Sequence, residues 1–134
     1  MPHFVVEYTD NLGEAARIPE LLSKANRVLI DQGGVFPTGG IRSRAHRLTE
    51  YAIADQAADY AFVHIQLSIR VGRSEAVRRQ AGDALFAMIK AHFADLFAAR
   101  PLALSFEMHE EAEGWSWKHN NLHARLASKP PEAS

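Results

Sequence analysis

The sequence predicts an α+β fold of two layers, in which a four-stranded mixed sheet carries two helices on one face. Apolar residues alternate in four short segments, they recur every three or four residues in two longer segments, and the order strand, helix, strand occurs twice. We therefore expect one domain over residues 1–128, built from repeat one (2–58) and repeat two (59–128). Residues 129–134 are expected to form a flexible tail.

The first repeat contains two predicted strands and one helix. Residues 2–8 alternate and are rich in Phe and Val, which is typical of a strand. Residues 17–31 have helical spacing of apolar positions, with Pro19 acceptable in the first turn. In residues 40–54 small or apolar side chains alternate with charged ones, and this pattern predicts a strand with one charged face.

The second repeat follows the same plan. Residues 60–69 and 102–110 are predicted strands, and the helix between them begins after the N-cap Ser74 and stops before Pro101. One face of this helix is expected to be apolar, namely Val77, Ala81, Leu85, Met88, Ile89, Leu96 and Phe97.

Strands joined by a crossover helix pair in parallel, so both helices are expected on one face of a mixed sheet. Two helices on one side were not expected to shield all the apolar strand residues, namely Phe4, Val6, Val63 and Ile65. This predicts an oligomer. The segment "WSWKHNNLHARL" is expected to add a strand or a clasp at the interface.

Composition narrows the class of protein. The chain has 134 residues, a formal net charge of -1, 47% hydrophobic residues and no cysteine. These values favour one soluble domain without disulfides or thiolate ligands, and the balanced charge argues against a nucleic-acid partner. The start has no signal-peptide core and the chain no apolar span of ~20 residues, so we expect a cytoplasmic protein with no membrane partner.

The dipeptide Met1-Pro2 suggests a chemical role. If Met1 is removed, a secondary amine becomes the first atom of the first strand. A terminal amine titrates at about 7.7–8.0, and burial or nearby cations lower its pKa toward neutrality. Such an amine can act as a base and then as an acid. The alternative is that proline at position two has no function.

Three arginines are candidate anion ligands. Arg42 and Arg44 are two apart on a predicted strand and share a face, and Arg73 lies where a strand leads into a helix N-terminus. Guanidinium groups bind carboxylates in a bidentate fork. The alternative is a solvated charged strand face together with a helix cap.

Other motifs point to no further chemistry. His119 and His123 are four apart, but Asn120 and Asn121 between them are typical of a turn, and no metal site is predicted. The glycine-rich segment "GGVFPTGG" follows a helix and precedes a strand, the reverse of a phosphate loop, and is interpreted as a flexible connection. Trp117 either walls a pocket or packs the tail.

These features together resemble the tautomerase superfamily. The segments "PHFVVEYTDN", "GIRSRAH", "DYAFVH", "LALSFE" and "KHNNLHA" occur in order and are similar to the 5-carboxymethyl-2-hydroxymuconate isomerase family over nearly the whole chain. Within the superfamily, "GRSEAVRRQAGDALF" adds to the likeness.

The resemblance implies an isomerase without a cofactor or a metal, assembled as a homotrimer, in the breakdown of homoprotocatechuate formed from 4-hydroxyphenylacetate. Its substrate is a small carboxylated dienol, and Pro2 would be the catalytic acid and base. Arg42 would bind the 2-keto acid end, Arg73 would hold another carboxylate, and Arg44 and Trp117 would also contact the substrate.

Two departures from the family leave the substrate open. The first repeat has no arginine matching Arg73, and Trp117 stands where the family usually has Phe. The alternatives are a keto-enol tautomerase for another carboxylated dienol, or a binding protein like macrophage migration inhibitory factor.

Overall fold

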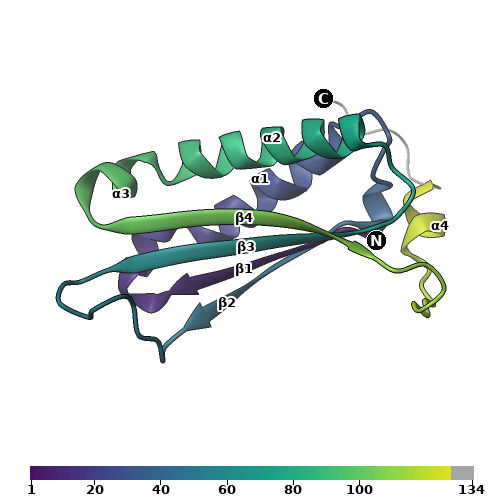
Figure 1. Ribbon diagram of the computed structural model, residues 1–134. Helices are drawn as coiled ribbons and strands as arrows, with labels where there is room; N and C mark the ends of the chain where they lie inside the picture. Colours follow the sequence, from purple (N-terminus) through teal and green to yellow (C-terminus); the bar gives the residue numbers. More distant parts are fainter. Residues whose placement is uncertain (128–134) are drawn as a thin grey trace.

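The computed structural model describes residues 1–127 and has two layers. Helices α1 (Ile18–Ile30) and α2 (Glu75–His92) both lie on one face of a four-stranded sheet (Figure 1). The predicted α+β class is confirmed.

The sheet has the order β2-β1-β3-β4. β1 (His3–Thr9) pairs in parallel with β2 (Arg42–Leu48), and β3 (Ala61–Arg70) pairs in parallel with β4 (Leu102–Glu111). β1 and β3 are antiparallel. Each β-α-β repeat is thus internally parallel, as predicted, and the structure shows that the two repeats meet through their first strands.

The helices follow the expected signals with one exception. Ser74 caps α2, because its Oγ accepts a hydrogen bond from the Val77 amide at 3.2 Å. The predicted long helix is interrupted at Phe93, which is buried and has φ -98° and ψ 11°, before the short α3 (Ala94–Ala99). Phe97 is 60% exposed, so its placement on the buried face was wrong: the interruption takes α3 out of the phase of α2.

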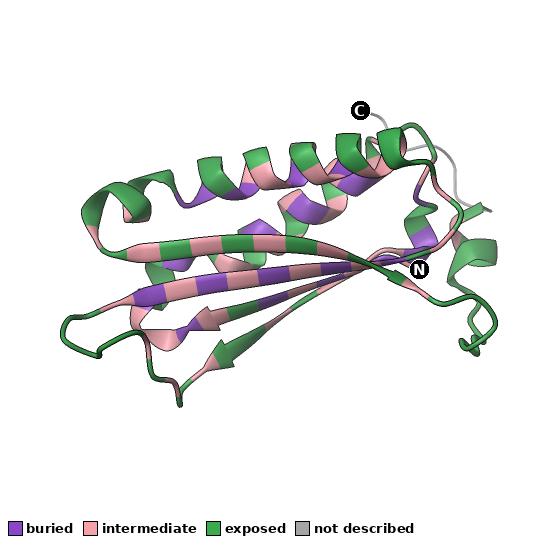
Figure 2. Ribbon diagram, in the orientation of Figure 1, coloured by how far each residue is buried: buried purple, intermediate pink, exposed green. Residues whose placement is uncertain are grey.

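The core lies between the sheet and the two helices (Figure 2). Phe4, Val6, Val63 and Ile65 are all 0% exposed in a single chain. The expectation that these residues need a partner chain was therefore wrong. All four point to the same side of the sheet, where α1 and α2 are long enough to cover them.

The opposite face of the sheet is polar. Residues opposite one another in register share a face, and His3 is aligned with Arg42 on β2 and with Ser68 on β3. Near the middle of this face Glu107 accepts a hydrogen bond from the Gln66 side chain at 2.8 Å and lies 3.1 Å from His64 Nε2. This face, which no segment of residues 1–127 covers, carries mainly charged and hydrogen-bonding groups, together with Val5 and Phe62.

The connections are more ordered than the sequence suggested. In the glycine-rich connection Phe36 is 1% exposed and the short 3-10 helix η2 (Thr38–Gly40) contains two buried glycines, so this segment packs into the core. The interpretation of this segment as a flexible connection was wrong, because Phe36 is buried in the core. Another 3-10 segment, η1 (Asp10–Ala16), follows β1.

The C-terminal part of the described chain contains a helix rather than a strand. Residues 112–121 have no regular structure, and α4 (Leu122–Ala127) packs against η2 of the same chain. The expected extra strand does not occur within residues 1–127. The expected flexible tail, 129–134, lies outside the described residues.

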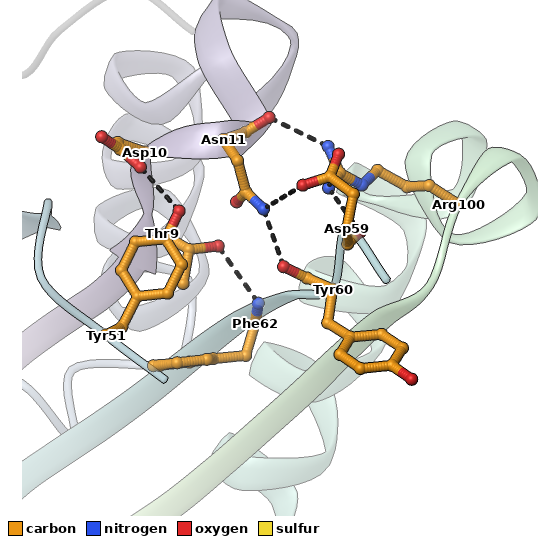
Figure 3. Close-up of polar contacts among 8 residues, drawn as sticks. All are labelled: Thr9, Asp10, Asn11, Tyr51, Asp59, Tyr60, Phe62 and Arg100. Atoms are coloured by element: carbon orange, nitrogen blue, oxygen red, sulfur yellow. Dashed lines mark hydrogen bonds and ion pairs between the residues drawn. The ribbon is translucent and has the colours of Figure 1, made fainter. Parts of the chain in front are cut away.

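A polar cluster ties the linker between the repeats to the end of β1 (Figure 3). The Asn11 side-chain amide donates to Asp59 Oδ1 at 3.0 Å and to the Tyr60 carbonyl at 2.7 Å. Arg100 binds the same Asp59 carboxylate at 3.0 Å and donates to the Asn11 carbonyl at 2.9 Å. This cluster lies at the end of the sheet remote from the N-terminus.

No helix within residues 1–127 is both long enough and apolar enough to cross a membrane.

Candidate active site

A cavity of about 340 Å³ surrounds the N-terminus at one end of the sheet. Three of its lining residues are cations, and no lining residue carries a carboxylate. The lining residues are Met1, Pro2, Pro37, Gly40, Arg70, Arg73, Lys118, Asn120 and His123. This surface is suited to a small anion.

Two other hollows in the described chain are larger but lack this character. One, of about 420 Å³, contains Glu75 and Asp83 beside two arginines, so its charges are balanced. The other, of about 450 Å³, is mainly apolar and is lined by Phe97 and Leu104 among others. We therefore regard the cavity at Pro2 as the candidate active site.

Pro2 is buried and held by the sheet. Its carbonyl accepts a hydrogen bond from the Arg42 amide at 2.9 Å, which extends the parallel β1-β2 pairing to the N-terminus. Proline has no amide hydrogen to donate to the ladder, so a Pro2 nitrogen freed by removal of Met1 stays available for chemistry. The residue type and the strand position together place this nitrogen at the cavity.

The guanidinium group of Arg73 is fixed by the connection between β3 and α2. It donates to the Val35 carbonyl at 3.0 Å and to the Arg70 carbonyl at 3.2 Å, and it lies 4.6 Å from the centroid of the Phe36 ring. Its Nε is buried and has no hydrogen-bond partner within residues 1–127. A donor left unpaired in this way favours an acceptor supplied by a ligand.

The C-terminal segment supplies the remaining polar lining. The Asn120 side-chain oxygen accepts from the Leu122 amide at 3.1 Å, which sets the start of α4 and turns the chain back toward the N-terminus. His123 then contacts the two buried glycines of η2, Gly39 and Gly40.

The environment of the N-terminus lowers its basicity. Burial lowers the pKa of the Met1 amine below its ordinary value, and the Lys118 ammonium and Arg70 guanidinium lower it further, whereas Glu111 acts in the opposite direction. The Pro2 nitrogen lies one residue away in the same surroundings.

Of the five predicted site residues, the structure brings Pro2 and Arg73 into one cavity. Arg42 is adjacent through its backbone, but its guanidinium donates to the Gly39 carbonyl at 2.9 Å and does not line the cavity. Whether it binds substrate stays a prediction.

The other two predicted residues lie apart from this cavity. Arg44 lies on the sheet face opposite the helices, and its Nη1 is 3.0 Å from His3 Nδ1. Burial lowers the pKa of His3, and the positive charge of Arg44 lowers it further. Trp117 is 83% exposed and stacks edge-on against Trp115 at 6.5 Å. Neither lines the cavity in this chain.

Sequence reasoning missed four polar lining residues, Arg70, Lys118, Asn120 and His123. Three of these belong to the "KHNNLHA" segment, which was recognised as a family motif but given no role in the site. His123 was considered only as a metal ligand, and no cluster that could hold a metal occurs within residues 1–127.

Comparison with known proteins identifies the family and agrees with the fold. A family model described as 5-carboxymethyl-2-hydroxymuconate isomerase matches residues 2–126. The chain is 49% identical over 124 residues to the 5-carboxymethyl-2-hydroxymuconate Delta-isomerase of Escherichia coli, covering 92% of this chain and 98% of that protein.

Solved structures extend the comparison. A 5-carboxymethyl-2-hydroxymuconate isomerase from Deinococcus radiodurans R1 has a TM-score of 0.89 and 56% identity over 93% of each chain. A fused 4-OT wild type symmetric trimer, 17% identical with a TM-score of 0.58, covers 82% of this chain and 87% of that one and shares the fold alone. The chain belongs to the 5-carboxymethyl-2-hydroxymuconate isomerase family and has the tautomerase fold.

Proposed function

We propose that this protein isomerises 5-carboxymethyl-2-hydroxymuconate, a dienol with three carboxylates, to its 2-oxo-3-ene isomer in the degradation of homoprotocatechuate. The observation that carries this proposal is the cavity at Pro2, whose lining contains three cations and no carboxylate. Membership of the isomerase family supports the same reaction.

The chemistry is a proton transfer that needs one group of moderate basicity. The neutral Pro2 nitrogen, freed by removal of Met1, takes the proton from the 2-hydroxyl, and the C2–O bond becomes a carbonyl. The C2=C3 electron pair moves to C3=C4, and the C4=C5 pair takes the proton back from Pro2 at C5. The same nitrogen acts as base and then as acid, which requires an amine pKa close to the working pH.

The arginines are proposed to hold the substrate and stabilise its charge. Arg73 binds one carboxylate, since its guanidinium is positioned beside Pro2 and its Nε has no protein partner in the described chain. Arg42 is proposed to bind the 2-keto acid end, where negative charge develops on the 2-oxygen. This role requires its side chain to leave the Gly39 carbonyl.

We also propose that the protein is a homotrimer. The sheet face opposite the helices has no cover within residues 1–127 and is polar enough to meet another copy through hydrogen bonds and ion pairs. Arg44 lies on that face, so its proposed contact with substrate would be made across a subunit boundary.

The test is an ultraviolet assay of dienol loss on protein whose N-terminus has been verified by mass spectrometry. Pro2→Ala should lower kcat by roughly 10²-fold or more with a smaller change in KM. Alanine still supplies a primary amine, so some activity should remain. Full activity in this variant would refute the role of Pro2, and activity on other carboxylated dienols alone would indicate a related tautomerase. Binding of the dienol without turnover by the wild-type protein would indicate a binding protein.

A further inference from the structure

Lys118 is a cavity residue with no assigned role. It lies in the irregular segment that precedes α4, far in sequence from the other two cations of the cavity, Arg70 and Arg73. Those two are close in sequence and belong to the end of β3 and the connection that follows. The C-terminal segment thus brings a separate positive charge to the N-terminus.

The position of Lys118 is set by tertiary packing. α4 packs on η2, and a Cβ atom placed on Gly39 would lie 3.0 Å from His123 Nδ1 and 3.1 Å from the His123 amide nitrogen. The absence of a side chain at Gly39 lets α4 approach so closely. The Asn120 side chain caps the turn between Lys118 and this docked helix.

Lys118 forms no ion pair within the described chain. The ion pairs found within residues 1–127 join other cations to Asp or Glu, and Lys118 takes part in none of them. It lines the cavity together with Met1, where its charge contributes to lowering the pKa of the Met1 amine. Lys118, Arg70 and Arg73 therefore bring three positive charges to a cavity without a carboxylate in its lining, which favours an anionic ligand.

We propose that Lys118 binds one carboxylate of the substrate and thereby selects a tricarboxylate over a dicarboxylate. This assignment deepens the proposed function, on which the identity of the substrate rests. An ammonium is a point charge suited to a single carboxylate, whereas Arg70 and Arg73 carry forked donors. Lys118 thus adds a third cation to Arg70 and Arg73 in the cavity, and the docked C-terminal segment supplies it.

Substrate discrimination tests this role. We expect Lys118→Met to raise KM for 5-carboxymethyl-2-hydroxymuconate roughly 10- to 100-fold, because the variant loses one hydrogen bond between charged groups. We expect little change in kcat, and little change in KM for 2-hydroxymuconate, which lacks the carboxymethyl group. Lys118→Arg should restore most of the affinity. The matched control is Lys90→Met, which removes a lysine that packs on Phe86 of α2 and does not line the cavity.

Binding separates this proposal from the proposed reaction. Calorimetric titration with the unreactive propane-1,2,3-tricarboxylate should show the same loss of affinity in Lys118→Met, with no loss for glutarate. Equal losses for both acids, or no loss for either, would overturn the role of Lys118 even if the isomerase activity stands. If the wild-type protein does not isomerise 5-carboxymethyl-2-hydroxymuconate, the proposed reaction fails, while the titration still measures selection by Lys118.

Discussion

His123 occupies the space that a side chain on Gly39 would need. The built Cβ at Gly39 would lie 3.2 Å from the His123 Cα, which is backbone that side-chain rotation cannot move. The contact joins the connection before β2 to α4, and both segments line the candidate active site.

Gly39→Ala should therefore displace α4 and open the cavity. We expect roughly a tenfold loss of kcat/KM from the misplaced lining residues, with the melting temperature changed little. Faster proteolysis within residues 113–127 should accompany the loss. Gly82→Ala is the control, because this glycine lies inside α2 and its added Cβ makes ordinary contacts with the end of Met108 at 3.4 Å and with Phe106 at 3.9 Å. Alanine there should stabilise the helix and leave kcat/KM unchanged. Wild-type kinetics in Gly39→Ala would show that α4 docking has no bearing on the site.

Asn11 is expected to affect stability without affecting the reaction. Its side-chain amide holds the linker at the end of the sheet remote from the cavity (Figure 3). Asn11→Ala leaves the Tyr60 carbonyl without this donor and should cost about 1–2 kcal/mol of unfolding free energy. The melting temperature should fall by roughly 3–8 °C. Thermal unfolding and steady-state kinetics measured on one preparation check this, and a change in kcat/KM would contradict the separation of the two ends.

His92 is expected to make stability depend on pH. It is 4% exposed, and its Nε2 lies 2.8 Å from the Ala16 carbonyl, which can only accept. Its Nδ1 lies 3.2 Å from Lys24 Nζ, which can only donate. These partners require the neutral ring with the proton on Nε2. Burial is the main cause that lowers the His92 pKa; Arg17 and Lys24 lower it too, while the Ala16 carbonyl and Glu20 raise it.

The sign of this dependence follows from linkage. The unfolded chain binds a proton at His92 near its ordinary pKa of about 6.5, whereas the folded chain resists protonation. The contribution of His92 is therefore fully present above that value and is lost as the pH falls through it toward the lowered folded pKa. Melting temperatures at about pH 7.5 and 5.5 should differ more for the wild type than for His92→Gln. Equal differences in the two proteins would contradict the assignment.

The sequence was sufficient for the parts of the fold that depend on local patterns. Alternation located β1 and β3, helical spacing located α1, and the hydroxyl of Ser74 located the start of α2. The break at Phe93 could not be predicted, because Phe93 fits a continuous apolar stripe and only its packing in the core shows that the helix ends there.

The sequence predicted a site residue only where its type and its position in the chain together indicate a chemical role. Pro2 and Arg73 were found because a terminal imino nitrogen and an arginine at a strand-to-helix junction are distinctive. Lys118 and His123 reach the cavity through the contact of two glycines with α4, and no periodicity encodes such a long-range contact. Their signal was the "KHNNLHA" motif, whose docking site the sequence alone did not reveal.

The pKa of Pro2 itself gives the last prediction. In protein without Met1, burial and nearby cations should hold the pKa of the Pro2 amine below the ordinary value of about 7.7–8.0 for a terminal amine. Catalysis needs the neutral amine, so kcat/KM should rise with pH through this pKa and then level. Arg70→Gln removes a cation that lines the cavity without removing a hydrogen-bonding side chain. Because the protonated amine is then less disfavoured, the rising limb of the profile should move to higher pH. Titration of ¹⁵N-labelled Pro2 by NMR should show the same displacement in the absence of substrate. A limb that moves to lower pH, or an NMR titration unchanged by the substitution, would mean that Arg70 does not act on the Pro2 amine.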